Sequence, residues 1–311
     1  MPTACSRLAP SPTGALHLGN ARTFLWNWAL ARTQSWQLVM RIEDFDGPRV
    51  RPGAAQASLE TLKWLGLDWD GPALVQTDDR DPYVTAIEGL AQRGLAYPCT
   101  LSRREIAAAA PHEDDHEIPF EPSLRPPDAG RPMDFHPEEG THWRLVVSPE
   151  AEPVSDMLRG ELDCYPAREC GDFVIWTVRD EPAYQLAVVV DDIRQQVTDV
   201  VRGDDLLPSA ARQQLLYRHL GHPAPRWWHL PLVRGSDGRR LAKRHGDTRI
   251  DHYRDSGVPP ERVVGLLAWW CGLLPERSPL SAADFRDRFD ETALPSDDVV
   301  MTAEDDAWLR G

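Results

Sequence analysis

The sequence has no long hydrophobic run, which excludes one large class of proteins. None of its apolar stretches approaches the ~18 residues that a membrane-spanning helix needs. Its first residues, MPTACSRLAP, also lack the charged and then apolar order of a secretory signal. We therefore expect a cytoplasmic protein with no membrane partner.

Cysteine and positive charge are both scarce. The five cysteines are an odd number, lie far apart and form no C-x-x-C pair, which predicts free thiols; a bond between Cys164 and Cys170 is the alternative. The formal net charge of −15 argues against a dedicated non-specific nucleic-acid binder, whose affinity comes from many Lys and Arg contacts to phosphates. A local basic patch remains compatible with this charge.

The beginning of the chain has the pattern of an α/β fold. With 311 residues, the chain is long enough for two domains or for one large domain with an insertion. A short β-like segment, SRLA, leads through a glycine-containing loop into a helix from Ala21, and the apolar run WQLVMRI predicts a buried strand. This order is typical of the start of a parallel sheet. Glu43 and Asp44 directly follow the second strand, at the edge where open α/β sheets bind ligands.

From about residue 97 to 170 the chain becomes proline-rich and acidic. Its least regular segment, PHEDDHEIPFEPSLRPPDAGRP, predicts an inserted module with long loops. From Asp172 strand patterns return in DFVIWTV and YQLAVVVDD, followed by a strand and a helix in VTDVVRGDDLLPSAARQQLLYRHL, so we expect the parallel sheet to resume. ERVVGLLAWWCGLL and ADFRDRF predict helices near the end.

The stretch HEDDH, His112 to His116, matches the H-E-x-x-H pattern of zinc proteases. In those enzymes the pattern lies on an apolar, buried helix, where two histidines face one metal. Here Pro111 precedes it, aspartates fill it and nothing nearby has the pattern of a core. A solvated acidic loop is the better interpretation.

Two segments have features of a phosphate-binding site. Residues 10–20, PSPTGALHLGN, place two glycines and His17 before a strong helix, where backbone N–H groups and the helix dipole favour anions. A plain strand-to-helix turn is the alternative. Residues 235–247, GSDGRRLAKRHGD, gather basic side chains around glycines. Because two cationic segments can hold a polyphosphate from both sides, we expect ATP as a ligand.

Several longer segments together resemble the class I glutamyl-tRNA synthetases. In chain order they are RLAPSPTGALHLGNARTFLWNWALAR, RIED, YPAREC with DFVIW, AYQLAVVVDD, TDVVRGDDLL and RRLAKRHGD. HLGN stands in the place of the family's HIGH signature, and RLAKR, residues 240–244, in the place of its KMSKR loop. The resemblance covers most of residues 7–250 and implies a Rossmann-like α/β catalytic core with a parallel sheet, an inserted module and a short helical C-terminal region.

The resemblance also implies a reaction and its residues. Such enzymes let the α-carboxylate of glutamate attack the α-phosphate of ATP, which accompanies Mg²⁺, to give glutamyl-adenylate and pyrophosphate. His17 is expected to contact ATP phosphate, and Lys243 to stabilise the departing pyrophosphate. The implied ATP-binding residues are Pro10, His17, Gly19, Asn20, Arg240, Leu241, Lys243 and Arg244. The implied glutamate-binding residues are Arg7, Ala9, Ser11, Glu43, Tyr184 and Arg202, with the arginines for carboxylates and Glu43 for the ammonium.

The sequence departs from the family pattern in two places. Arg240 and Ala242 replace a lysine and a serine of the KMSKR loop, which should tune activation without abolishing it. Short relatives carry four ligands for a structural zinc, but here Cys99, Leu101, Phe120 and Leu124 occupy those positions. Because a tetrahedral site cannot be built on one thiol, we expect no zinc. A replacement site from Cys99, His112 and His116 is the alternative.

The resemblance implies a division of the chain. Residues 1–96 and 172–232 are expected to form the two halves of the catalytic domain, and 97–171 the inserted acceptor-side module with its degenerate zinc site. Residues 233–311 should hold the KMSKS-type loop and a helical stem-contact region, without an anticodon-binding domain. This makes the chain most similar to the truncated glutamyl-queuosine tRNA(Asp) synthetases, which activate glutamate without tRNA and transfer it to queuosine.

The partners expected from this resemblance are L-glutamate, ATP and the anticodon arm of tRNA(Asp). Arg103, Arg104, Arg239 and Arg240 are the basic residues expected to contact the RNA, and we expect a monomer. Two alternatives remain: a paralogue that delivers glutamate to another acceptor, and a non-catalytic binding module. Retention of His17, Glu43, Arg202 and Lys243 together argues against the second.

Overall fold

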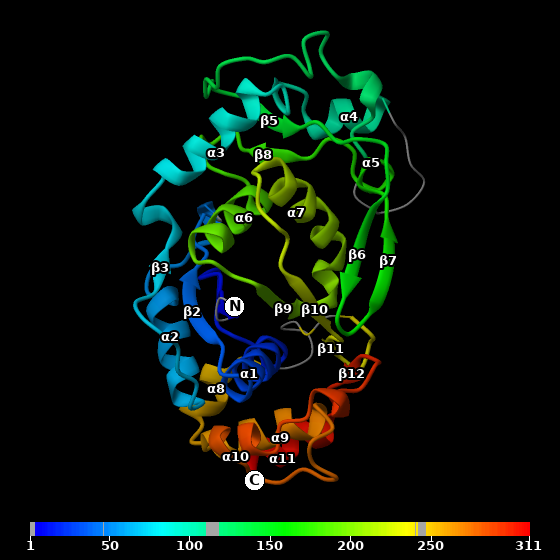
Figure 1. Cartoon of the computed structure of the whole chain (residues 1–311). Coiled ribbons are helices and arrows are strands. Elements are labelled where there is room, and N and C mark those ends of the chain that lie inside the picture. The colour runs from blue at the N-terminus through cyan, green and yellow to red at the C-terminus, as the bar shows by residue number, and fades with distance from the viewer. Residues whose placement is uncertain (1–3, 46, 110–117, 240, 242–246) are drawn as a thin grey trace. The chain divides into compact units, whose positions relative to one another are not determined.

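The computed structural model describes residues 4–45, 47–109, 118–239, 241 and 247–311. The chain forms two compact units. The first comprises Met1–Val75, Val197–Leu206 and Trp227–Gly311, and the second comprises Gln76–Gln196 and Leu207–Arg226. The chain therefore leaves the first unit and returns to it twice, as its colours show (Figure 1).

The first unit contains the predicted parallel strands. β1 (Cys5–Leu8) pairs with β2 (Gln37–Ile42), and β2 pairs with β3 (Leu74–Val75), both in parallel. On the other side of β1, the backbone N–H of Thr198, which precedes β9 (Asp199–Gly203), donates to the carbonyl of Cys5 at 2.8 Å. The prediction of an α/β fold with a parallel sheet is confirmed.

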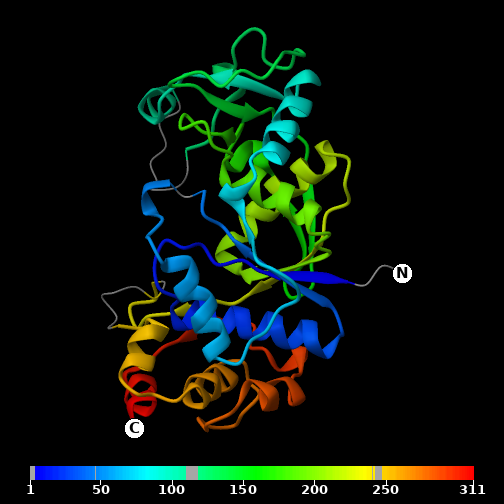
Figure 2. The same cartoon turned by 90° about the vertical axis from the view of Figure 1, so that its left-hand side faces the viewer.

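Helix α1 (Leu18–Thr33) is the centre of the first unit. It contacts β1, β2 and β9, and also α9 (Pro260–Trp270) and α10 (Ala282–Asp287), so that it lies between strands and C-terminal helices (Figure 2). Trp26 packs against the rings of Trp228 and Phe289. The buried Arg22 donates to the carbonyls of Pro231 and Trp270.

The remaining elements of this unit are η1 (Gly47–Arg49), α2 (Ala54–Trp64), η4 (Asp204–Leu206), β10 (Arg226–Leu230), β11 (Val233–Arg234), α8 (Ile250–Asp255), η6 (Glu291–Ala293), β12 (Val299–Val300) and α11 (Ala303–Arg310).

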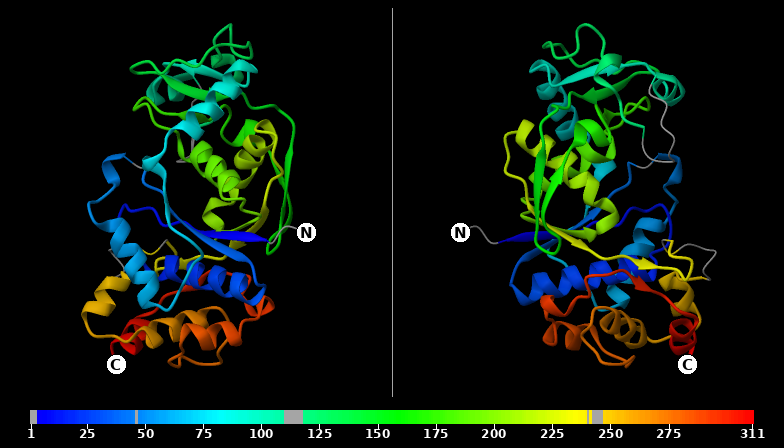
Figure 3. Two further views of the ribbon diagram at one scale, coloured as in Figure 1. Left: turned by 60° about the vertical axis from the view of Figure 1, so that its left-hand side comes forward. Right: turned by 90° about the vertical axis from the view of Figure 1, so that its right-hand side faces the viewer.

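The second unit combines helices with antiparallel strands (Figure 3). Helix α6 (Tyr184–Arg194) packs against α3 (Asp81–Gln92) and α7 (Leu207–His219). β4 (Ala96–Cys99), β5 (His142–Leu145) and β8 (Val174–Trp176) form an antiparallel sheet, and β6 (Glu152–Asp156) pairs with β7 (Gly160–Cys164). The other elements are η2 (Gln76–Asp78), α4 (Arg103–Ala109), η3 (Pro122–Leu124) and α5 (Pro166–Glu169).

Two expectations for the region after Asp172 are wrong. YQLAVVVDD forms helix α6 rather than a strand, although its three consecutive valines favour strands. The helix is stabilised by tertiary contacts: the buried Asp191 accepts from the hydroxyl of Tyr83 at 2.8 Å and from Gln76 at 2.7 Å. β8 pairs antiparallel with β5, so the strand in DFVIWTV does not resume the parallel sheet.

Other predictions from the sequence are confirmed. The strand and helix after Val197 are β9 and α7, and the two helices near the end are α9 and α10. α1 begins at Leu18, slightly before the expected Ala21. All five cysteines are free and buried. In the part of the chain that the structure describes, every helix is too short or too polar to cross a membrane.

Candidate active site

The turn that carries His17 is held in a defined conformation at the start of α1. His17 is the N-cap residue, with an extended backbone, and its N–H lies 3.4 Å from the side-chain oxygen of Asn20. Its Nδ1 lies 3.0 Å from the hydroxyl of Thr248, which is 1% exposed. The N–H of Leu18 donates to the carbonyl of Thr248, and that of Asn20 donates to the His17 side chain. The positive end of the α1 dipole, which favours an anion, thus lies next to a histidine with a fixed ring.

Neither glycine of this turn is needed by the protein's own backbone or packing. Gly14 and Gly19 both have φ outside the left-handed region. A Cβ added at Gly14 would meet nothing within 4 Å, and one at Gly19 would meet only the Cβ of Val233 at 3.6 Å, an ordinary contact. Space for a side chain is therefore left open beside His17, which suits a ligand that approaches the backbone closely.

The same loop runs beside the end of β2. The backbone N–H of Glu43 donates to the carbonyl of Pro10 at 3.2 Å, so the structure brings these two predicted site residues together. The Glu43 carboxylate accepts from the fully buried Arg41 at 3.1 Å, and its side chain is 11% exposed. Ala9 is partly buried, Pro10 is buried and Ser11 is exposed. The Glu43 carboxylate is thus paired with Arg41 and held near the loop.

Arg7 and Arg202 are buried cations on neighbouring strands. Arg7, in β1, is 6% exposed and donates from Nη1 to the carbonyl of Val201 at 3.1 Å, one residue before Arg202. Arg202, near the end of β9, is 5% exposed. It donates from Nε to Nε2 of the buried His229 at 2.9 Å and from Nη2 to the carbonyl of Leu206, and its guanidinium lies over the ring of Trp227. The structure therefore places two predicted carboxylate-binding residues on neighbouring strands.

The other predicted site residues are less well defined by the structure. Tyr184 is the first residue of α6 in the second unit and is 42% exposed. Leu241 is partly buried and Asn20 is exposed. Arg103 and Arg104 are exposed in the second unit, whereas Arg239 is exposed in the first. Arg240, Ala242, Lys243 and Arg244 lie outside the described residues.

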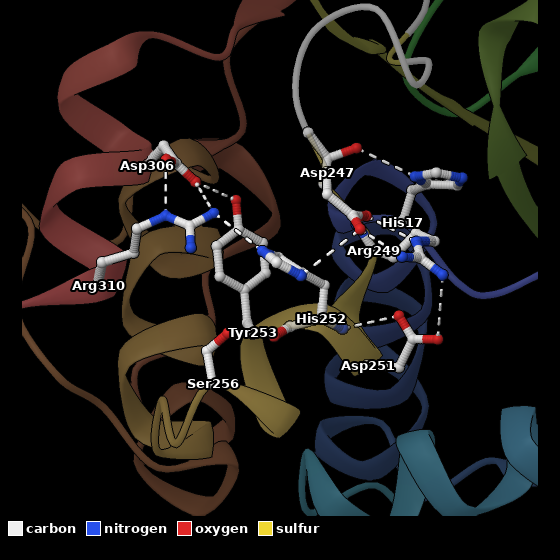
Figure 4. A network of polar contacts seen from close by, with 10 residues as sticks. His17, Asp247, Arg249, Asp251, His252, Tyr253, Ser256, Asp306 and Arg310 are labelled. Carbon is white, nitrogen blue, oxygen red and sulfur yellow. Dashed lines mark hydrogen bonds and ion pairs between the residues drawn. The ribbon is translucent and has the colours of Figure 1, made fainter.

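The segment that follows the KMSKS-type loop carries a network of charges (Figure 4). Asp247 forms an ion pair with Arg249, and it lies 3.5 Å from Nδ1 of His252. The hydrogen bonds from Arg249 lower the pKa of Asp247 to about 2. Nε2 of His252 accepts from Arg310, whose guanidinium is paired with Asp306 one helical turn earlier in α11. Since Arg310 can only donate, the proton of neutral His252 is on Nδ1, facing Asp247.

The four positions that correspond to zinc ligands in short relatives come together in one apolar cluster. Cys99 and Phe120 are buried there with Tyr97 and Ile106, and Leu101 and Leu124 pack against them. Phe120 is paired with Gly171, where any Cβ would lie 2.0 Å from the carbonyl oxygen of Phe120. Arg144 covers the Phe120 ring from 4.3 Å. Apolar packing therefore occupies the place where a metal would be needed.

The residues present do not fit a tetrahedral metal ion at this cluster, because Cys99 is the single sulfur or nitrogen ligand among the four positions. Elsewhere among the described residues, no group of three or more His, Cys, Asp and Glu side chains is arranged to hold a metal. His112 and His116, which belong to the alternative site, lie outside the described residues.

Two residues at the site were missed by reasoning from the sequence. Thr248 follows the basic loop as an ordinary polar residue, and no spacing links it to His17, which lies far away in the chain. His229 lies in the apolar stretch WWHL, where a buried histidine has no distinctive pattern. The available signal was its spacing of two residues from Trp227, which places both side chains on one face of β10.

Comparison with known proteins assigns the family. The family model of the class I tRNA synthetases (E and Q), catalytic domain, matches residues 4–276. The Glutamyl-Q tRNA(Asp) synthetase of Rhodopirellula baltica is 46% identical in an alignment of 295 residues that covers 89% of this chain and 87% of that protein. The protein of the same name from Symbiobacterium thermophilum is 40% identical over 99% of this chain and 98% of its own length.

The structural comparison agrees. The crystal structure of a glutamate-tRNA synthetase from Elizabethkingia anophelis matches with a TM-score of 0.82 at 25% identity, over 99% of this chain and 70% of that one. The predicted fold class is confirmed, and the chain is a ligase-type enzyme. It belongs to the class I tRNA synthetases for glutamate and glutamine and, among them, to the glutamyl-Q tRNA(Asp) synthetases.

Proposed function

We propose that this protein activates L-glutamate with ATP in the absence of tRNA and transfers the glutamyl group to queuosine in the anticodon of tRNA(Asp). The observation that carries the proposal is the pair of buried arginines, Arg7 and Arg202, on neighbouring strands. Guanidinium groups bind carboxylates through charge-assisted and often bidentate hydrogen bonds. A dicarboxylic amino acid offers two carboxylates for such contacts.

Glutamate needs partners for two carboxylates and one ammonium. Arg7 and Arg202 supply guanidinium groups for the carboxylates, and Glu43 supplies a carboxylate for the ammonium. Tyr184, Ala9 and Ser11 are proposed as further glutamate-binding residues. Glutamine would leave an arginine charge uncompensated, and the pocket should therefore reject it.

ATP is proposed to bind at the turn that carries His17. The N-terminus of α1 favours phosphate, and the open space at Gly14 and Gly19 allows the nucleotide to approach the backbone. His17 contacts a phosphate, and Lys243 stabilises the leaving pyrophosphate, with Pro10, Asn20, Arg240, Leu241 and Arg244 as further ATP-binding residues. Mg²⁺ arrives with the ATP phosphates, which provide most of its ligands besides water.

The chemistry requires positioning and charge neutralisation rather than a protein nucleophile. A carboxylate oxygen of glutamate attacks the α-phosphorus of ATP, the bond to the bridging oxygen breaks, and pyrophosphate leaves with the electron pair. The products are glutamyl-adenylate and pyrophosphate. Preorganised cations lower the barrier because negative charge develops on the leaving group.

The acceptor is supported by the names of the relatives, since proteins 40–46% identical to this chain are called Glutamyl-Q tRNA(Asp) synthetases. We propose that the anticodon arm, held through Arg103, Arg104, Arg239 and Arg240, presents its modified base to the adenylate. We also propose that the protein acts as a monomer and that residues 97–171 fold without zinc, as the apolar cluster around Phe120 supports.

Glutamate-dependent exchange of pyrophosphate into ATP, measured without tRNA, tests the activation step. We expect exchange with L-glutamate. We expect Lys243→Ala to lose about 3 kcal/mol of transition-state stabilisation, the scale for one preorganised donor. Exchange that requires added tRNA, or that is absent, would contradict the proposal.

A further inference from the structure

The side chain of His17 is held by a residue from the other end of the first unit. Its Nδ1 lies 3.0 Å from the hydroxyl of Thr248, and that threonine is almost completely buried. A threonine hydroxyl both donates and accepts, so it can satisfy Nδ1 in either protonation state of the ring. The backbone N–H of Asn20 also donates to the His17 side chain, so the ring is held from α1 as well as by Thr248.

The backbone around Thr248 fixes this contact. Leu18 donates its N–H to the carbonyl of Thr248 at 3.1 Å, and Ile250 donates to the carbonyl of Leu16 at 2.8 Å. His17 and Arg249 thereby form an antiparallel bridge. Thr248 cannot move relative to His17 without breaking the backbone hydrogen bonds that Leu16 and Leu18 form on either side of His17.

The bridge is itself anchored to the C-terminal helix. Asp247 and Arg249 flank Thr248 and form an ion pair with each other, while Asp247 faces His252 (Figure 4). Arg310 of α11 donates to His252 at 3.1 Å and pairs with Asp306, which also accepts from the hydroxyl of Tyr253 at 2.7 Å. These charged contacts connect α8 and α11 to the segment beside His17.

We infer that Thr248 is a positioning residue for the ATP-activation step, which orients the His17 imidazole from a segment anchored to α11. The inference rests on the proposed function, because it assumes that His17 contacts ATP phosphate. Thr248 itself touches no substrate in this account. Its contribution is to hold the imidazole ring in one orientation before ATP arrives.

The test compares Thr248→Val, which keeps the shape and removes the hydroxyl, with Thr248→Ser, which keeps the hydroxyl. Glutamate-dependent pyrophosphate exchange without tRNA gives kcat and KM for ATP, and thermal unfolding reports on folding. We expect T248V to lower kcat/KM for ATP by about 10- to 100-fold, the range for one hydrogen bond to a charged or catalytic group, and T248S to stay within about threefold of wild type. Thr33→Val, at the exposed C-terminal end of α1, is the matched control and should change neither the kinetics of exchange nor the unfolding temperature.

A double-mutant cycle separates positioning from a structural role. In the His17→Ala background, T248V should have almost no further effect, because the group that Thr248 positions is gone. An equal loss in both backgrounds, or T248V with wild-type kinetics, would overturn the inference while leaving the proposed function intact. A wild-type protein without exchange would overturn the proposed function instead. If T248V does not fold, Thr248→Ala replaces it in the same cycle.

Discussion

Arg202 donates a hydrogen bond from its Nε to Nε2 of His229 at 2.9 Å, inside the protein. Because an arginine N–H can only donate, the accepting nitrogen carries no proton and His229 is neutral. The rings of His229 and Trp227 are stacked, and Trp227 also lies under the Arg202 guanidinium. A buried arginine is thus oriented by two aromatic residues of β10.

Arg202→Gln tests the role of this oriented guanidinium. We expect kcat/KM for glutamate to fall about a hundredfold, near 3 kcal/mol, since a buried carboxylate would lose its charged partner. Discrimination against glutamine should weaken at the same time. The exposed Arg226→Gln, on the same strand as His229, is the control. Unchanged preference for glutamate over glutamine in R202Q would remove Arg202 from the pocket.

Gly19→Ala separates folding from ligand binding. The added Cβ meets only Val233 at an ordinary distance, so the free energy of unfolding should stay equal or rise by up to about 1 kcal/mol. The KM for ATP should rise about tenfold or more, because the methyl group enters the proposed nucleotide space. Gly89→Ala, a helical glycine in α3 with nothing within 4 Å, is the matched control. Normal ATP kinetics in G19A would argue against ATP at this turn.

The apolar cluster around Phe120 should make the second unit independent of zinc. Elemental analysis is expected to find well below one zinc per chain, and a chelator should leave the unfolding temperature unchanged. Phe120→Ala should cost about 3–5 kcal/mol of stability, as for other buried aromatic truncations, whereas the exposed Val178→Ala should cost little. Stoichiometric zinc whose removal unfolds the protein would show that a metal site exists after all.

The charge network beside Thr248 predicts acid sensitivity. Arg249 holds the pKa of Asp247 at about 2, below the usual aspartate value of 3.8, and Arg310 lowers the pKa of Asp306. A carboxylate whose folded pKa is depressed stabilises the protein above its unfolded pKa, and this contribution is lost as the pH falls through the folded value. Urea unfolding should therefore show stability falling from about pH 4 toward pH 2, less steeply in Asp247→Asn. Asp128→Asn, at an exposed position, is the control. If the free energy of unfolding falls equally steeply with pH in D247N and wild type, Asp247 does not contribute to the acid sensitivity.

The sequence predicted the parts of the site that depend on local pattern. The glycine turn before α1, the strand before Glu43 and the strand that carries Arg202 all follow from apolar periodicity and turn residues. The helical structure of α6 did not, because its valines favour a strand and the helix depends on tertiary contacts such as those of Asp191 with Tyr83 and Gln76. Single-sequence patterns do not contain such long-range contacts.

The contacts that orient the proposed site residues could not be predicted from the sequence either. Thr248 reaches His17 and His229 reaches Arg202 across long separations in the chain, and neither residue stands out by type or spacing. The apolar cluster is an intermediate case. The loss of metal ligands at Leu101, Phe120 and Leu124 was visible in the sequence, but their convergence with Cys99 required the fold.

Transfer of labelled glutamate to tRNA(Asp) tests whether queuosine is the acceptor. Four substrates are compared: tRNA(Asp) with and without queuosine, each with its terminal adenosine intact or trimmed away. We predict that both queuosine-containing tRNAs are labelled and that neither tRNA without queuosine is. Added salt should reduce transfer steeply, because it weakens contacts to phosphates. Label that requires the terminal adenosine, or that appears equally without queuosine, would contradict the account and favour a truncated synthetase with a different acceptor.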